Sequence, residues 1–222
     1  MLKLLIELIG SAFLSLIFNT CGPYSTLQFP LLFGLWVLLI FGAKISGGHY
    51  NPAVSLGFII RKDPGTFSRI VGVVYILFQV IGAFLGSMLA WFFTFSGSGG
   101  SIDVFKSDSN IICAVIGEAI GTFILVFFYL VQTEKSTKYS KDPAFNCLII
   151  ASSYIAARSI VASSAYSKAG AVLNPAIGFG TCLVQLFANG WTGFQYFWIF
   201  SFIPFGGAII AVVFYEFAFK KT

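Results

Sequence analysis

Long apolar runs separated by short polar loops dominate this chain. A helix that crosses a lipid bilayer needs about 20 mostly apolar residues. Six runs come near this length, over residues 4–20, 29–43, 70–93, 111–131, 144–161 and 194–219. Several of them need flanking residues to complete a crossing. The pattern therefore predicts an all-α membrane protein with six transmembrane helices.

Two further apolar segments, 51–60 and 174–187, are too short to cross a membrane. Both begin with Asn-Pro-Ala, which is formed by Asn51, Pro52 and Ala53 in the first segment and by Asn174, Pro175 and Ala176 in the second. Asn is a strong helix N-cap, and Pro costs no hydrogen bond in the first helical turn. Both segments are therefore predicted to be re-entrant half-helices that begin abruptly at the asparagine.

The two halves of the sequence repeat each other. The segment 6-IELIGSAFL-14 of the first predicted span returns as 117-GEAIGTFIL-125 in the fourth, which pairs Glu7 with Glu118. Each half holds three spans, so the second half must enter the membrane in the opposite sense. Such an inverted repeat brings paired broken helices face to face near mid-bilayer. We predict a single channel domain over 1–222, with inverted repeats at about 1–95 and 110–222.

The composition supports a lipid environment. Hydrophobic residues make up 58% of the 222 residues and charged residues only 9%, whereas a soluble domain carries roughly a quarter charged residues. The net charge of +5 does not indicate nucleic acid, because the basic residues lie in short loops, where Lys and Arg set membrane topology. Most of them fall on one predicted side, at 3, 61–69, 135–141 and 220–221. We therefore expect a multi-pass protein with both termini cytosolic.

No cofactor, metal site or catalytic centre is predicted. The four cysteines are scattered without metal or redox spacing. His49 is the only histidine, and the chain has no Ser-His-Asp arrangement, metalloprotease motif or phosphate-binding loop. We therefore expect a protein that is not an enzyme.

The backbone before each half-helix is expected to be extended, because a helix starts directly after it. Irregular backbone inside a membrane is tolerated only where it faces protein or a water-filled cavity. We expect a ladder of carbonyl acceptors for a single file of solute, formed by Gly47, Gly48, His49, Tyr50, Gly170, Val172 and Leu173. Two helix N-termini, each worth about half a positive charge, and the two asparagine amides would attract a neutral solute and repel a cation.

The loops 46-SGGHYNPAVSLG-57 and 170-GAVLNPAIGFG-180 resemble the two signature loops of the aquaporin, or major intrinsic protein, family. The resemblance covers almost the whole chain. It implies six tilted helices and two half-helices, a homotetramer in the lipid bilayer with one pore per protomer, and Glu7 and Glu118 as buried anchors of the loop backbones. It also implies passive conduction of water and of small uncharged solutes such as urea, ammonia, hydrogen peroxide or glycerol.

The narrow filter of the family is where this sequence departs from the pattern. Water-selective members carry Arg directly after the second motif, where this chain has Ile177. The other filter positions are Ala171, Ile160 or Ala162 on the fifth span, and Leu31 or Phe33 on the second span, the alternatives depending on the alignment. All of these residues are apolar. The filter is similar to those of tonoplast-type and unorthodox members, and it leaves open a solute-selective channel that conducts water poorly.

Two further residues near this path have two interpretations each. Arg158, one turn before Ala162, could supply a pore charge in place of the absent filter arginine. We favour the alternative that it caps the helix or reaches the membrane interface. His49 could act as a pH-sensitive gate, but we favour a packed structural residue.

Other classes of membrane protein fit the sequence less well. A channel of the formate/nitrite type lacks paired Asn-Pro-Ala motifs, and a scaffold that has lost transport would be identified by liposome swelling. The sequence leaves the plasma membrane and an intracellular membrane, vacuolar or endoplasmic reticulum, equally open.

Overall fold

The computed structural model of the chain describes residues 1–21, 28–63, 65, 67–94, 108–162 and 171–220. The long helices are α1 (Leu2–Thr20), α2 (Phe29–Ala43), α4 (Arg69–Thr94), α5 (Asp108–Thr133), α6 (Pro143–Ala162) and α9 (Phe197–Phe214). The shorter elements are α3 (Pro52–Ile60), α7 (Pro175–Asn189), α8 (Trp191–Phe194) and a final π-helical turn, Tyr215–Phe219. All six predicted spans and both predicted half-helices are therefore present, with small changes at their ends.

Two boundaries differ from the sequence-based expectation. The last predicted span, 194–219, is divided into the end of α8, the whole of α9 and the π-helical turn. The second half-helix runs to Asn189 rather than to 187, and it ends where Gly190 adopts a φ of 67°. Glycine commonly ends helices in this way, because it has no Cβ to clash in the left-handed region.

Four stretches of the described chain could cross a membrane by length and composition alone: Leu2–Thr20, Arg69–Phe93, Ile111–Thr133 and Trp191–Phe219. The other two of the six long helices, α2 and α6, are not among these four stretches. Helix α2 has 15 residues, or about 22 Å at 1.5 Å per residue. Helix α6 includes buried polar side chains, among them Asn146 and Arg158. The two helices pack against each other.

Glycines allow the helices of each half to approach closely. A Cβ added at Gly82 of α4 would lie 2.2 Å from the Leu8 carbonyl oxygen of α1. In the second half, a Cβ added at Gly207 of α9 would lie 2.3 Å from the Ala119 carbonyl oxygen of α5. Helices in a membrane associate through such small-residue contacts. The same device therefore fixes the corresponding helix pair in both halves.

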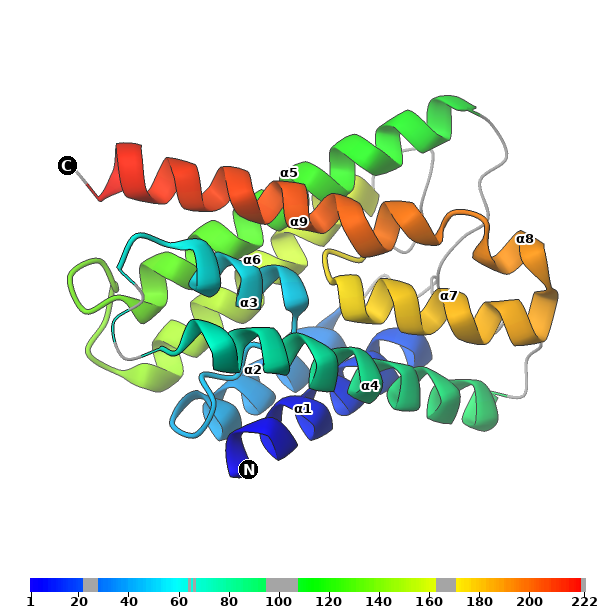
Figure 1. Cartoon of the computed structure of the whole chain (residues 1–222), viewed down its shortest axis with the longest axis horizontal. Helices are drawn as coiled ribbons and strands as arrows, with labels where there is room; N and C mark the ends of the chain where they lie inside the picture. Colours follow the sequence, from blue (N-terminus) through cyan, green and yellow to red (C-terminus); the bar gives the residue numbers. More distant parts are fainter. Residues whose placement is uncertain (22–27, 64, 66, 95–107, 163–170, 221–222) are drawn as a thin grey trace.

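The two half-helices meet at the centre of the molecule. Figure 1 shows α3 and α7 running from the middle toward opposite ends, with the long helices around them. Both chain termini lie at the same end of the molecule, called the terminus end. Helix α3 runs toward this end, and α7 runs away from it. The opposite end is called the far end below. This arrangement places the residues just before α3 and α7 side by side in the interior.

Large apolar side chains are exposed on the outside of the bundle. Their exposed fractions are 53% for Phe41, 59% for Leu77, 60% for Phe92, 61% for Ile112 and 59% for Phe202. Such a surface is stable where lipid covers it, since exposed apolar area on this scale is unfavourable in water. The six long helices and the two re-entrant helices therefore form a membrane domain.

Candidate functional site

Each Asn-Pro-Ala asparagine caps its own half-helix. Asn51 is extended (φ −154°), and its Oδ1 accepts a 2.8 Å hydrogen bond from the Ala53 N–H. Asn174 is also extended (φ −144°), and its Oδ1 accepts a 3.0 Å bond from the Ala176 N–H. These bonds satisfy one of the donors that every helix N-terminus leaves unpaired. The abrupt helix starts predicted from the motifs are confirmed.

The same two asparagines join the halves across the centre. The Asn51 Nδ2 donates to the Leu173 carbonyl oxygen at 2.8 Å, and the Asn174 Nδ2 donates to the Tyr50 carbonyl oxygen at 2.9 Å. An amide NH₂ group carries two N–H donors, so each asparagine uses one of them to hold the opposite loop. The two motifs therefore form a single reciprocal unit rather than two independent caps.

Two buried glutamates hold the loop backbones. Glu7 accepts from the His49 N–H at 3.0 Å and from the Tyr50 N–H at 2.8 Å. Glu118 accepts from the Val172 N–H at 2.6 Å and from the Leu173 N–H at 2.8 Å. Neither glutamate side chain is accessible to solvent. These bonds agree with the anchoring role that the family resemblance implies for both residues.

The anchors keep two strained residues in place. Tyr50 and Leu173, each directly before a motif asparagine, have φ values of 48° and 57°. Non-glycine residues rarely adopt positive φ, and such strain persists only where surrounding contacts fix it. Glycines leave the space that these side chains need, because a Cβ at Gly10 would lie 2.0 Å from the Tyr50 ring and a Cβ at Gly121 would lie 2.5 Å from Leu173.

Hydrogen bonds within the protein restrict the predicted carbonyl ladder. The Tyr129 hydroxyl lies 2.8 and 2.9 Å from the carbonyl oxygens of Gly47 and Gly48. The Tyr154 hydroxyl donates to the Val172 carbonyl oxygen at 3.0 Å. A carbonyl oxygen has two lone pairs, so a bonded member of the ladder keeps only its second one for a solute. Gly170, the remaining predicted member of the second ladder, lies outside the described residues.

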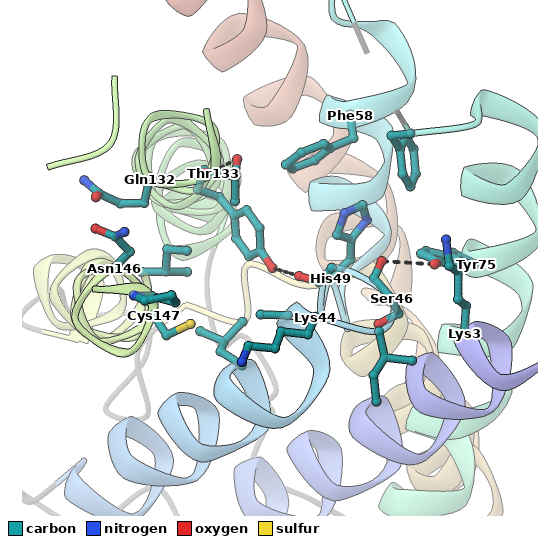
Figure 2. Close-up of a pocket in the computed structure, with 18 of the residues that line it drawn as sticks. Lys3, Lys44, Ser46, His49, Phe58, Tyr75, Gln132, Thr133, Asn146 and Cys147 are labelled. Atoms are coloured by element: carbon teal, nitrogen blue, oxygen red, sulfur yellow. Dashed lines mark hydrogen bonds between the residues drawn. The ribbon is translucent and has the colours of Figure 1, made fainter. Parts of the chain in front are cut away.

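Two cavities follow the central loops. The larger, about 490 Å³, opens at the terminus end and is called the vestibule; Figure 2 shows Asn146 and Cys147 on one wall and Ser46 and Tyr75 on the opposite wall. The smaller cavity, about 20 Å³ and called the chamber, is lined by both motif asparagines, Asn51 and Asn174. A volume of roughly 10–15 Å³ is enough for one water molecule. The chamber can therefore hold about one water between the motifs.

Three residues line both cavities: His49, Tyr129 and Ile150. They are called the neck. The His49 ring packs among aromatic rings, with centroid distances of 4.5 Å to Phe58 and 5.1 Å to Phe67, and its Nδ1 lies 3.1 Å from the Ser55 Oγ. The packed structural role that we favoured for His49 agrees with these contacts. The ring nevertheless borders the path between vestibule and chamber.

The family is decided by comparison with known sequences. A model of the major intrinsic protein family matches residues 5–215.

The chain belongs to the major intrinsic protein family.

Its relatives include aquaporins of two types. Aquaporin TIP1-1 of Arabidopsis thaliana is 32% identical over 198 residues, which cover 86% of this chain and 70% of that protein. The probable aquaporin PIP2-5 of the same plant is 29% identical over 209 residues, covering 91% and 70% of the two chains. The solved structure of the aquaglyceroporin from Plasmodium falciparum has the same fold, with a TM-score of 0.72 at 22% identity over 98% of this chain and 96% of that one.

The structure separates the two candidates for the filter residue on α2. Leu31 is 3% exposed, whereas Phe33 is 49% exposed and stacks on Phe29 at the surface. Two residues apart on a helix means about 200° of rotation, so these side chains point in nearly opposite directions. Phe33 was therefore a wrong candidate, and Leu31 alone is directed inward.

Two of the remaining filter candidates are fully buried beside the second motif. Ala171 and Ile177 have no exposed surface. The side chains of Ile160 and Ala162, near the end of α6, lie outside the described residues. The described part of the candidate filter is therefore apolar on α2, on the second loop and on α7.

Arg158 departs from the interpretation that we favoured. Its side chain is only 5% exposed, so it does not reach the membrane interface. The guanidinium donates from Nη1 to the Ala171 carbonyl oxygen and lies over the Phe18 ring of α1 at 4.5 Å. A buried arginine is costly unless hydrogen bonds and rings compensate its desolvation. The expectation that Arg158 reaches the membrane interface is corrected: its side chain turns inward and bonds the second loop at Ala171.

Several residues of the site were not found from the sequence. Tyr129 and Tyr154 bond the loop carbonyls, and Gln79 donates to the Glu7 carboxylate at 2.7 Å. The signal available for Gln79 was its polarity inside an apolar span, since polar residues there are expensive and often functional. The tyrosines stand among 27 phenylalanines, and nothing in the sequence distinguishes them from core aromatics.

Proposed function

We propose that this protein is a passive membrane channel for water and small uncharged solutes, with its path through the vestibule, the neck and the chamber toward the far end. The observation that carries the proposal is the central unit of two capped half-helices, whose asparagines line the chamber together. Two helix N-termini that converge there contribute positive potential, which favours lone pairs and disfavours cations. The aquaporin names of the relatives support the same assignment.

The family and the charge distribution support a proposal for the assembly and the orientation of the protein. We infer a homotetramer in which each protomer has its own pore, formed by one domain over 1–222. The vestibule is lined by Lys3, Lys44, Arg61 and Lys138. Because Lys and Arg are enriched in cytoplasmic loops, we place the vestibule and both termini on the cytosolic side. No catalytic activity is proposed.

A second substrate profile has its own support. The ring of Leu31, Ala171 and Ile177 is apolar, and hydrophobic constrictions can exclude water from a pore. A channel with such a ring would pass urea or ammonia efficiently and water slowly. The test is stopped-flow light scattering on proteoliposomes, with water, glycerol, urea, ammonia and hydrogen peroxide measured side by side.

The expected result is a permeability above that of empty liposomes for water and for at least one other solute. High urea or ammonia permeability with water flow at the level of empty liposomes would favour the second profile. Permeabilities equal to those of empty liposomes for every solute, from protein shown to be folded and reconstituted, would contradict both.

A further inference from the structure

A stripe of α6 side chains follows the path through the molecule. Ile150 lines both cavities, and Tyr154, one turn later, lines the chamber. Residues four apart lie on the same face of a helix, with about 6 Å of rise between them. Arg158 is the next residue of this stripe, four after Tyr154, and all three side chains are buried. The stripe therefore leads from the neck through the chamber to Arg158.

The other walls of the chamber lead to the same level. Leu14 of α1 lines the chamber, and Phe18, one turn further, lies under the Arg158 guanidinium. Leu35 of α2 lines the chamber, and the chain one turn before it, at Leu31, is buried. The start of α2 also reaches Arg158, since the Oε1 of its N-cap residue, Gln28, lies 3.4 Å from the Arg158 Nε.

The second loop completes this level. Asn174 lines the chamber, and three residues earlier the Ala171 carbonyl oxygen accepts from Arg158. Helical spacing and these contacts place four residues at one level beyond the chamber, toward the far end, and they are called the far ring: Phe18, Leu31, Arg158 and Ala171. Arg158 is its charged member.

The charge matters because α7 supplies none. The residue after the second motif is the apolar Ile177, which is buried. An arginine guanidinium remains charged at any physiological pH, and a fixed positive charge at a narrow point of a pore repels cations. We propose that Arg158, carried by the spanning helix α6, supplies the positive charge of the far ring and is the main barrier to protons and other cations there.

This proposal rests on the proposed channel function and changes one expectation. With Ile177 alone, the cation barrier would be left to the half-helix dipoles, each worth about half a charge and effective only within a turn. With Arg158 in the far ring, cation exclusion is expected to be retained despite the apolar residue at 177.

The test measures water flow and proton leak in the same proteoliposomes, the second with an entrapped pH-sensitive dye under a potassium diffusion potential. Arg158→Gln is expected to keep water permeability at or above the wild-type level and to raise proton leak roughly tenfold or more, since a unit charge close to the path acts strongly in a medium of low dielectric. Arg158→Lys keeps the charge and is expected to stay within about twofold of wild type. Arg69→Gln, an exposed arginine outside the cavity walls, is the matched control and should leave the leak unchanged.

Two results with the Arg158 variants would overturn the proposal. If the Arg158→Gln variant conducts water without a raised proton leak, the charge of Arg158 is not the barrier. Arg158→Lys that leaks as much as Arg158→Gln would assign the effect to the guanidinium hydrogen bonds instead of the charge. If Arg158→Gln does not fold, Ala171→Asp decides: it keeps Arg158 and places a carboxylate beside it, so a raised leak supports the proposal and an unchanged leak contradicts it. Wild-type protein without water permeability would instead refute the channel function itself.

Discussion

The two halves of the pore share a framework and differ in chemistry. In each half a buried glutamate holds two backbone amides, a strained residue precedes the motif, and an asparagine caps a half-helix. The first half adds a network of neutral polar side chains, in which Ser46 and Gln79 donate to Glu7 and Gln79 also bonds Ser55. In the second half, Arg158 bonds the loop carbonyl.

This comparison distinguishes the residues that hold the pore together from the residues that determine which solutes pass. The repeated parts fix the backbone of both loops through one glutamate and one asparagine in each half. The parts that differ lie beside the path. Positive charge at the terminus end surrounds a cavity of about 490 Å³, where mobile ions screen it. Arg158 is buried beside the second loop, and the field of a buried charge is screened much less.

The largest effect is expected at the anchors. Glu7→Ala removes the acceptor of four donors, whereas Glu118→Ala removes the acceptor of two backbone amides. Each buried donor left unpaired costs about 1–3 kcal/mol. We therefore expect a larger loss of stability for Glu7→Ala, at about 4 kcal/mol or more, than for Glu118→Ala, at about 2 kcal/mol or more. Thermal unfolding in one detergent checks the order, and equal losses would show that the anchors do not differ.

The neck should respond next. Tyr129 lines both cavities, whereas Tyr154 lines only the chamber among the described cavities. Tyr129→Ala is expected to widen the neck and raise water permeability by roughly two- to fivefold. Tyr154→Ala should have a smaller effect, because the chamber is already open around it. Stopped-flow shrinkage at equal protein density measures both, and a larger increase for Tyr154→Ala would place the narrow point elsewhere.

Much of this could be predicted from the sequence, because the decisive signals were periodic or repeated. Apolar runs predicted the spans, the doubled motif predicted the half-helices, and the repeat of segment 6–14 at 117–125 predicted the pairing of Glu7 with Glu118. The choice between Leu31 and Phe33 depended on which face of the second span points inward. Counting back from Asn51 does not determine that face, because a loop separates the span from the motif. The depth of Arg158 and the hydroxyl bonds of Tyr129 depend on tertiary packing, which residue spacing does not reveal.

Thiol reagents can distinguish the two ends. Cys147 lines the vestibule, whereas Cys182 of α7 is 1% exposed. A bulky mercurial is therefore expected to inhibit wild-type water flow partially through Cys147, and Cys147→Ser should remove most of that inhibition. Osmotic permeability before and after the reagent is the measurement, and inhibition lost only with Cys182→Ser would contradict the assignment of the vestibule.

The smallest expected effect tests which face of α2 belongs to the far ring. Leu31→Ala is expected to raise urea permeability by about twofold, because the loss of three side-chain carbons widens the far ring. Phe33→Ala, a similar truncation on the opposite face of α2, should leave urea permeability unchanged because its side chain is exposed. Urea-gradient light scattering compares the two variants. A larger effect of Phe33→Ala would show that α2 presents its other face to the path.

The most direct test of the account is the temperature dependence of osmotic water permeability in proteoliposomes of the wild-type protein. The central claim is that solute passes through the chamber between Asn51 and Asn174, along a continuous hydrogen-bonded path. We predict a permeability above that of empty liposomes, with a clearly lower activation energy. A permeability and an activation energy equal to those of empty liposomes, from folded and correctly inserted protein, would contradict the claim.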